Sequence, residues 1–278
     1  MRGNVFLRYV LPPLIALPIG FLLLYPQLIR CMRISQSAAF RSLSHTQGVY
    51  VSRKTTPKQE IVLRQHVLTA RDRIRRFWSG QKGKAILIYC PSQSDYEQYC
   101  IGGEGAGCSL GLPWGDSYLV LGPDGNNTDV IAHELCHDEL FARLGWWRVK
   151  RQIPQWFNEG LALMVDYRFS SPSVWEHPDS IQTEDPLFER QAPVYRNPVM
   201  IKLKDLETTR DFFGGGSEHV MRAYQTAAEE VARWLSLVEQ PGVPALANAI
   251  LAGKPFSKAY QELERTHRNN QKRQSSKP

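Results

Sequence analysis

The segment His133–His137 reads H-E-x-x-H, and this motif constrains the fold more than any other feature of the chain. Residues four apart lie on one face of an α-helix, so both imidazoles can reach a single metal ion. Glu134 lies beside that face. A catalytic zinc site takes three protein ligands and leaves one position open. The motif therefore predicts a helix that carries two ligands of a Zn²⁺ ion, with Glu134 available as a general base.

A second motif, Trp156-Phe157-Asn158-Glu159-Gly160, follows the first. Its glutamate is the natural third ligand, and we expect it in the first turn of another helix. The alternative for a bare H-E-x-x-H motif is a pair of core or surface histidines that bind nothing. The second motif favours the metal site over that alternative.

The residues around the first motif have the pattern of a strand, a turn and a helix. Ser117–Leu121 is predicted to be a strand. Asn127 or Thr128 can cap the helix that follows, and Gly145 stands where that helix should end. The helix that carries His133 and His137 is thus delimited at both ends.

Taken together, the two motifs resemble those of the gluzincin zinc metallopeptidases, the group that includes thermolysin and the zinc aminopeptidases. The chain looks most like the small, membrane-tethered, peptidase MA-like members. The resemblance implies that His133, His137 and Glu159 bind Zn²⁺ and that Glu134 is the general base. It also implies an α+β zincin-like fold, with a small sheet whose edge strand is 117–121, an active-site helix and a helical C-terminal part.

Two departures from the family pattern refine this expectation. The G-x-M-E-N element that holds a free amine in the aminopeptidases is absent, and Gly103–Cys108 stands in its place. An endopeptidase that acts on peptide or protein substrates is therefore expected. Leu163 occupies the position of an acid that supports the ligands in thermolysin-like chains. Asp166 is the substitute, while Asp138 and Glu139 could also supply supporting hydrogen bonds.

A late helix, expected after Gly214–Gly216, carries Tyr224 on its apolar face. Similar chains have a tyrosine on a late helix that hydrogen-bonds the oxyanion, so Tyr224 is a candidate catalytic residue. The alternative is a core tyrosine, because burial is the default on an apolar stripe. His219 is a rival donor.

Residues Tyr9–Ile29 contain no charged side chain. A run of this length is long enough for one helix to cross a bilayer. Arginines flank both ends, and they argue against cleavage at Ser37–Ala39. We therefore expect an uncleaved, single-pass signal anchor in the cell membrane. The catalytic domain is expected on the extracytoplasmic (periplasmic) side, although the basic flanks do not set the orientation.

The net charge of +7 is concentrated at the two ends of the chain. Four arginines lie within residues 1–33 and five basic residues lie beyond position 264, so the body between them carries a net charge of −2. A nucleic-acid groove needs its basic residues on the folded face, and this distribution does not supply them. The charges instead fit a protein near anionic lipid.

Three of the five cysteines, Cys90, Cys100 and Cys108, lie close together in the sequence. An oxidising compartment would allow one disulfide among them, and all three pairings remain open. Cys136 lies inside the motif helix, where a buried, inert thiol is expected.

The chain is expected to form one domain on a stalk. We assign 1–33 to the membrane anchor, 34–56 to a linker, 57–266 to the peptidase domain and 267–278 to a basic disordered tail. The predicted function is zinc-dependent peptide-bond hydrolysis. The alternative is a catalytically silent zinc-binding scaffold or binding module of the cell envelope.

Overall fold

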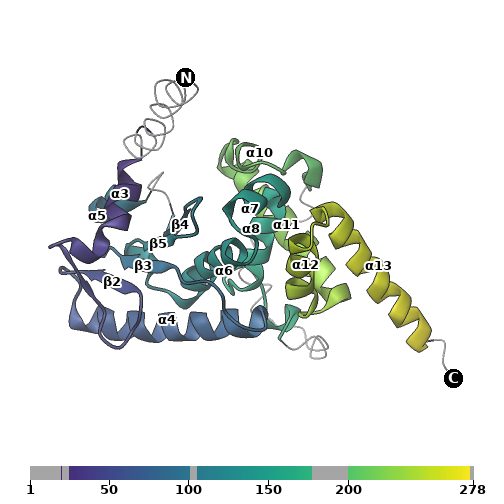
Figure 1. Ribbon diagram of the computed structural model, residues 1–278, viewed down its shortest axis with the longest axis horizontal. Coiled ribbons are helices and arrows are strands. Elements are labelled where there is room, and N and C mark those ends of the chain that lie inside the picture. The colour runs from purple at the N-terminus through teal and green to yellow at the C-terminus, as the bar shows by residue number, and fades with distance from the viewer. Residues whose placement is uncertain (1–19, 21–24, 101–104, 177–199, 276–278) are drawn as a thin grey trace, which may run out of the picture. The chain divides into compact units, whose positions relative to one another are not determined.

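A computed structural model of the chain describes residues 20, 25–100, 105–176 and 200–275 (Figure 1). The chain divides into two compact units. Unit 1 comprises the described residues up to Arg64, together with Ile86–Leu110 and Ser117–Asn126. Unit 2 comprises Gln65–Ala85, Gly111–Asp116 and the chain from Asn127 onward. The expected single domain is therefore organised as two units.

Unit 1 is built on a five-stranded mixed sheet with the order β1-β2-β3-β5-β4. Its strands are β1 (Phe40–Ser42), β2 (Val49–Ser52), β3 (Ile86–Tyr89), β4 (Gly107–Gly111) and β5 (Ser117–Leu121). β1 runs antiparallel to β2, whereas β2, β3 and β5 are parallel. The central strands β3 and β5 are almost continuously apolar and buried, as expected for strands covered on both faces.

Strand β5 was expected at the edge of the sheet, and this expectation is wrong. β5 lies between β3 and β4, so β4 forms that edge. The sequence of β4 hid the strand, because Gly107-Cys108-Ser109-Leu110-Gly111 has the small residues of a loop and few of the branched or aromatic side chains that favour strands.

The helices of unit 1 are α3 (Pro26–Met32), α5 (Gln93–Tyr99) and the first part of α4 (Pro57–Phe77). Thr56 and Gln59 form a reciprocal capping box at the start of α4. Two short 3-10 segments, η2 (Ile34–Gln36) and η3 (Pro123–Gly125), complete the unit.

Unit 2 is helical apart from its connections (Figure 1). After the second part of α4 it contains α6 (Thr128–Leu144), α7 (Trp146–Gln152), α8 (Gln155–Met164), α10 (Thr209–Phe213), α11 (Ser217–Val238), α12 (Gly242–Leu251) and α13 (Phe256–Ser275). Short 3-10 turns lie at Pro172–Val174 and Leu203–Asp205. An aromatic cluster of Trp156, Phe157, Trp234, Phe256 and Tyr260 joins α8, α11 and α13.

Gly160 permits α8 to pack closely on α11. A Cβ at this position would lie 2.5 Å from the carbonyl oxygen of Ala227 and 2.7 Å from Cγ2 of Val231. The glycine of the second motif is thus required by packing, since any side chain would push α8 away from α11.

The structure describes regular elements in two segments that were expected to lack them. The segment 34–56, expected to be a linker, contains β1 and β2 and buries Phe40, Leu43 and Val49. The tail, expected to be disordered from residue 267, continues α13 as a helix to Ser275. Apolar residues within the first segment decide its fold despite its many polar and basic neighbours.

Most of the expected membrane span lies outside the described residues. Its last residues, from Pro26, belong to α3, which buries Leu28 within unit 1. Among the residues that the structure describes, no helix is both long enough and apolar enough to cross a bilayer.

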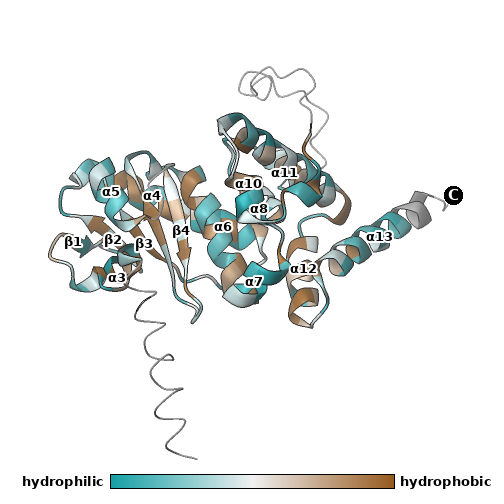
Figure 2. Ribbon diagram, turned by 90° about the horizontal axis from the view of Figure 1, so that it is seen from above, coloured by the Kyte–Doolittle hydropathy of each residue, from teal (hydrophilic) through white to brown (hydrophobic). Residues whose placement is uncertain are grey.

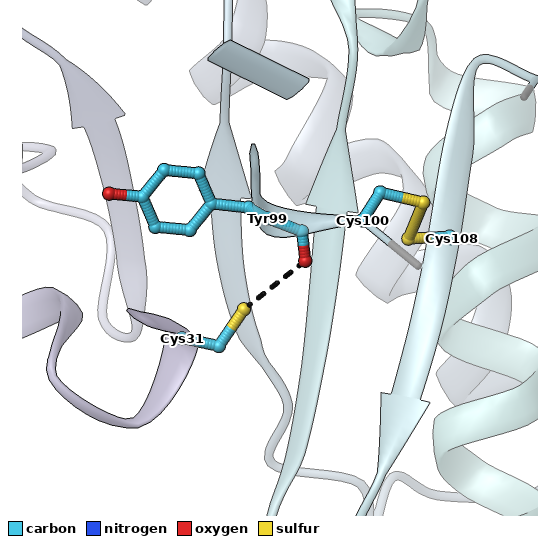
Figure 3. Close-up of a disulfide and its surroundings, with 4 residues drawn as sticks. All are labelled: Cys31, Tyr99, Cys100 and Cys108. Atoms are coloured by element: carbon cyan, nitrogen blue, oxygen red, sulfur yellow. Dashed lines mark hydrogen bonds between the residues drawn. A yellow bond between two sulfur atoms is a disulfide. The ribbon is translucent and has the colours of Figure 1, made fainter. Parts of the chain in front are cut away.

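Cys100 and Cys108 form a disulfide across the start of β4, with their Cα atoms 6.1 Å apart (Figure 3). This selects one of the three pairings that the sequence left open. Cys90 stays a free, buried thiol, as do Cys31 and Cys136. The Cys31 thiol donates to the backbone carbonyl of Tyr99, the residue before Cys100, at 3.6 Å (Figure 3).

The denatured, unreduced chain should therefore react with three equivalents of a thiol reagent, at Cys31, Cys90 and Cys136. Replacing both Cys100 and Cys108 by serine should lower the free energy of unfolding by about 2–3 kcal/mol, because it frees a short closed loop. Peptide mapping by mass spectrometry identifies the labelled cysteines. Chemical denaturation measures the change in the free energy of unfolding. Labelling of Cys100 or Cys108 in the unreduced chain would contradict this pairing.

Candidate metal centre

The helix α6 forms where the first motif predicted it. The Asn127 side chain caps it by accepting a hydrogen bond from the backbone N–H of Asp129 at 2.7 Å. Gly145 ends the helix with φ +79°, a conformation that glycine adopts without strain. Most of α6 is buried, including Glu134 and His137. The histidines of the motif are thus fixed on a rigid, enclosed helix.

The second motif lies on α8, which begins at Gln155, so Glu159 is in the second turn and not the first. Backbone carbonyls of Leu206 and Glu207 accept from the N–H groups of Trp156 and Gln155 and so complete the start of the helix. This segment of the chain therefore fixes where α8 begins.

The three predicted ligands converge in unit 2. The Nε2 atoms of His133 and His137 are 3.2 Å apart, and Oε2 of Glu159 lies 3.6 Å from the first and 3.7 Å from the second. One ligand atom from each residue lies within 4.8 Å of the others. The sequence prediction that these three side chains face one point is confirmed.

The outer side of His137 and Glu159 is held by residues of α8. Nδ1 of His137 lies 3.1 Å from Oδ1 of Asn158, and a proton on Nδ1 donates to this oxygen. A neutral His137 then presents the lone pair of Nε2 inward. Nε2 of Gln155 donates to Oε1 of Glu159 at 2.8 Å, which leaves Oε2 to face the histidines. The supporting roles of Gln155 and Asn158 were not anticipated from the sequence, although Asn158 was part of the motif.

The outer side of His133 faces Asp166. Its Nδ1 lies 3.4 Å from Oδ2 of this aspartate, a long contact that falls short of a well-aligned hydrogen bond. Arg168 binds Asp166 through two hydrogen bonds of 2.6 and 2.9 Å and so fixes the carboxylate. The substitute role expected for Asp166 is supported, and Arg168 is an addition that the sequence did not reveal.

The geometry of the three ligand atoms fits a metal ion. With Zn–N and Zn–O bonds of roughly 2.0–2.1 Å, ligand atoms of a tetrahedral zinc ion lie about 3.3–3.4 Å apart. The observed separations of 3.2, 3.6 and 3.7 Å bracket these values closely. Two imidazole nitrogens and a carboxylate at such separations repel one another unless a cation or a proton lies between them.

The electrostatics of the site favour positive charge at this point. Burial lowers the pKa of His133, but the carboxylates of Asp166, Glu159 and Glu134 outweigh it and raise the pKa to about 10. Burial raises the pKa of Glu159. The two histidines and Gln155 lower this pKa by more, so that it lies below its usual value. Burial likewise opposes ionisation of Asp166, but Arg168 and His133 lower its pKa to about 2. A cation is the species that this buried cluster stabilises.

Glu134 is buried on α6, and its charge acts on His133, Tyr224 and Arg168. The carboxylate that the first motif offered as a general base therefore lies near the cluster.

Tyr224 of α11 lies within electrostatic reach of Glu159, Glu134 and Asp166. Burial, followed by these three charges, raises the pKa of its phenol well above the usual range. Its ring packs edge-on against Phe212, with centroids 5.2 Å apart. The rival donor His219 instead donates through Nε2 to the carbonyl of Asp211 at 2.8 Å, which directs its ring to α10. Tyr224 is therefore the stronger candidate of the two.

Asp138 and Glu139 were expected to support the ligands, but the hydrogen bonds that the structure describes join them to the segment after α4 and to Arg143. Glu139 is fully buried and accepts from the backbone N–H groups of Lys82 and Gly83 and from Arg143. Asp138 accepts from the N–H of Ala85 at 3.0 Å. Because His137 points to the metal cluster, its sequence neighbours point elsewhere around the helix, and they fasten the chain segment after α4 to α6.

No protein-family model matches the chain, and no curated protein matches it in a sequence search. The arrangement of His133, His137 and Glu159 therefore carries the functional argument.

Replacing Asp166 by asparagine should weaken binding of Zn²⁺ by about 10–100-fold, because the amide removes the negative charge that orients and polarises His133. Competition with a fluorescent zinc chelator measures this affinity. Asp72→Asn is the matched control, since Asp72 is an exposed aspartate of α4 that pairs with Arg75 and Arg76. Equal affinities of the native chain and the Asp166 variant would refute the supporting role.

Proposed function

We propose that the chain is a zinc metallopeptidase that hydrolyses internal peptide bonds of peptide or protein substrates. The observation that carries this proposal is the convergence of two inward-facing imidazole nitrogens and one carboxylate, with a further carboxylate, Glu134, beside them. This donor set has the composition of a catalytic zinc site with three protein ligands. The gluzincin resemblance of the two motifs supports the same reaction.

His133, His137 and Glu159 would hold the ion. Zinc, when bound, supplies Lewis acidity, which makes water more acidic and a carbonyl more electrophilic. Asn158 and Gln155 keep the histidine and glutamate ligands oriented, and the Asp166–Arg168 pair does the same for His133. Holding the ligands in place before substrate arrives reduces the reorganisation that the reaction requires.

Glu134 would move the proton. As water attacks the scissile carbonyl carbon, the carboxylate of Glu134 takes one water proton while the new C–O bond forms. The same proton then passes to the leaving nitrogen as the C–N bond breaks. The products are a carboxylic acid and an amine, so no other reactant is needed.

Tyr224 would donate a hydrogen bond to the oxygen that gains negative charge. Its raised pKa keeps the phenol protonated throughout the physiological range, so the donor is always available. Within the described residues its hydroxyl has no hydrogen-bond partner to displace. A glycine-bearing segment replaces the amine-binding element of the aminopeptidases, which favours substrates without a free N-terminus.

We further propose that the enzyme is anchored in the membrane through the part of the uncharged run that precedes α3, with its catalytic part outside the cytoplasm. The uncharged character of that run supports the anchor. The disulfide between Cys100 and Cys108 supports an oxidising compartment.

The Glu134→Gln variant should bind one zinc ion per chain and keep its fold but lose hydrolysis of an N-terminally blocked peptide by at least about a hundredfold, because an amide cannot take the proton. Fluorogenic peptide cleavage and zinc analysis measure the two properties. The control is Glu218→Gln, an exposed residue of α11. A chain that binds zinc yet cleaves no peptide even when native would point to the silent scaffold, and strict dependence on a free amine would exclude the endopeptidase.

Tyr224→Phe should lower turnover by about a hundredfold with zinc affinity unchanged, because only a transition-state hydrogen bond is lost. Tyr260→Phe is the control, since the Tyr260 hydroxyl donates to Glu230 and its ring belongs to the aromatic cluster. Steady-state turnover, expressed per folded molecule, distinguishes a tyrosine that donates to the transition state from one that only packs in the core. Reduced stability with normal turnover would show that Tyr224 is a core residue alone.

A further inference from the structure

The helix α7 carries an exposed surface of aromatic and basic side chains that the metal centre does not use. We define the α7 patch as Trp147, Arg148, Lys150 and Arg151. Trp147 is 57% exposed although tryptophan is mostly buried in folded proteins. The three basic residues are exposed as well. Figure 2 shows α7 at the surface beside α6, which belongs to the same unit.

Within the described residues none of the three cations of the patch forms an ion pair, whereas Arg143 nearby is paired with Glu139. The charge of Glu159 acts on Lys150 without an ion pair between them. No Asp or Glu occurs in the sequence between Glu139 and Glu159. Arg151 instead lies over the ring of Trp147 at 5.7 Å, and Lys150 lies near the ring of Phe141 at 6.0 Å.

The turn after Gly111 brings a further aromatic residue, Trp114, and an acid, Asp116, to the neighbourhood of α7. A Cβ on Gly111 would lie 3.5 Å from Cδ1 of Trp146, so the turn after Gly111 begins against α7. This turn exposes Trp114, whose indole N–H donates to Asp116 at 3.1 Å. Counting Asp116, the region keeps an excess of positive charge.

We propose that the α7 patch docks on the surface of an anionic phospholipid bilayer. Lipid phosphates complement the unpaired cations, and an indole with a basic neighbour suits the boundary between headgroups and acyl chains. The charge-free run Tyr9–Ile29 favours a bilayer over a nucleic acid as the anionic partner. Because α7 connects α6 to α8, docking presents both ligand-bearing helices at the membrane. This proposal does not depend on zinc binding or hydrolysis.

The test uses the full chain with vesicles of neutral phosphatidylcholine or of phosphatidylcholine mixed with phosphatidylglycerol, each containing brominated lipid. Bromine quenches tryptophans that enter the interface, and the difference between the native chain and Trp147→Phe isolates the signal of Trp147. A chain anchored by its N-terminus would be held on both kinds of vesicle, so this local signal reports docking of α7 itself.

Quenching of Trp147 is expected on anionic vesicles and not on neutral ones, and it should vanish at high salt. The triple variant Arg148→Gln, Lys150→Gln, Arg151→Gln should weaken docking by on the order of a hundredfold, since each cation near an anionic surface contributes roughly fivefold. The matched control removes three exposed lysines elsewhere, as Lys58→Gln, Lys202→Gln, Lys258→Gln, and should keep the native quenching.

Three results would overturn the proposal: equal quenching on neutral and anionic vesicles, no quenching on either, or undiminished quenching in the triple variant. Binding of a single-stranded oligonucleotide that depends on the same three cations, without quenching by lipid, would assign the patch to nucleic acid instead. The dependence on anionic lipid and on salt needs only the native chain and Trp147→Phe, so this part of the test stands even if the triple variant misfolds.

Discussion

The arrangement of unit 2 depends on one constraint. Two imidazole nitrogens and a carboxylate oxygen must be held facing one another inside the folded protein. Their separations of 3.2, 3.6 and 3.7 Å are those of atoms that share one ion. Without positive charge between them, burial would be costly, because the lone pairs repel and the carboxylate loses its hydration. The surrounding structure keeps them together: Asn158 lies within hydrogen-bond distance of the outer nitrogen of His137, and the carboxylate of Asp166 faces that of His133 at 3.4 Å.

Several packing features hold the two ligand-bearing helices where the cluster needs them. Glu139 and Asp138 bind the backbone of residues 82–85 and so fasten α6 from its other side. Gly160 allows α8 to approach α11, which also brings Tyr224 within reach of the charges of the site. A residue next to a ligand can thus serve either the ion or the helix that presents it, depending on which side of the helix it occupies.

The ligands themselves could be predicted from the sequence because their spacing is local. His133 and His137 need only a helix, and Glu159 needs one more helix with a recognisable motif. The role of Arg168 could not be predicted, because it depends on how the chain turns after α8 ends. The strands β1 and β2 were missed because they are short and stand among polar and basic residues, and β4 because its small, glycine-bearing sequence resembles a loop. The partner that places β2 inside the sheet, β3, lies far away in the chain. The pairing of Cys100 with Cys108 likewise required the fold.

X-ray absorption at the zinc edge, on the purified full chain loaded with one equivalent of zinc, identifies the atoms that bind the ion. We expect a shell of nitrogen and oxygen atoms at roughly 2.0–2.1 Å with the outer scattering of two imidazoles and no sulfur. The His137→Ala variant should lose the outer scattering of one imidazole, which would identify His137 as a zinc ligand. A sulfur neighbour at roughly 2.3 Å, as a cysteine such as Cys136 would give, or a shell without imidazole, would contradict it.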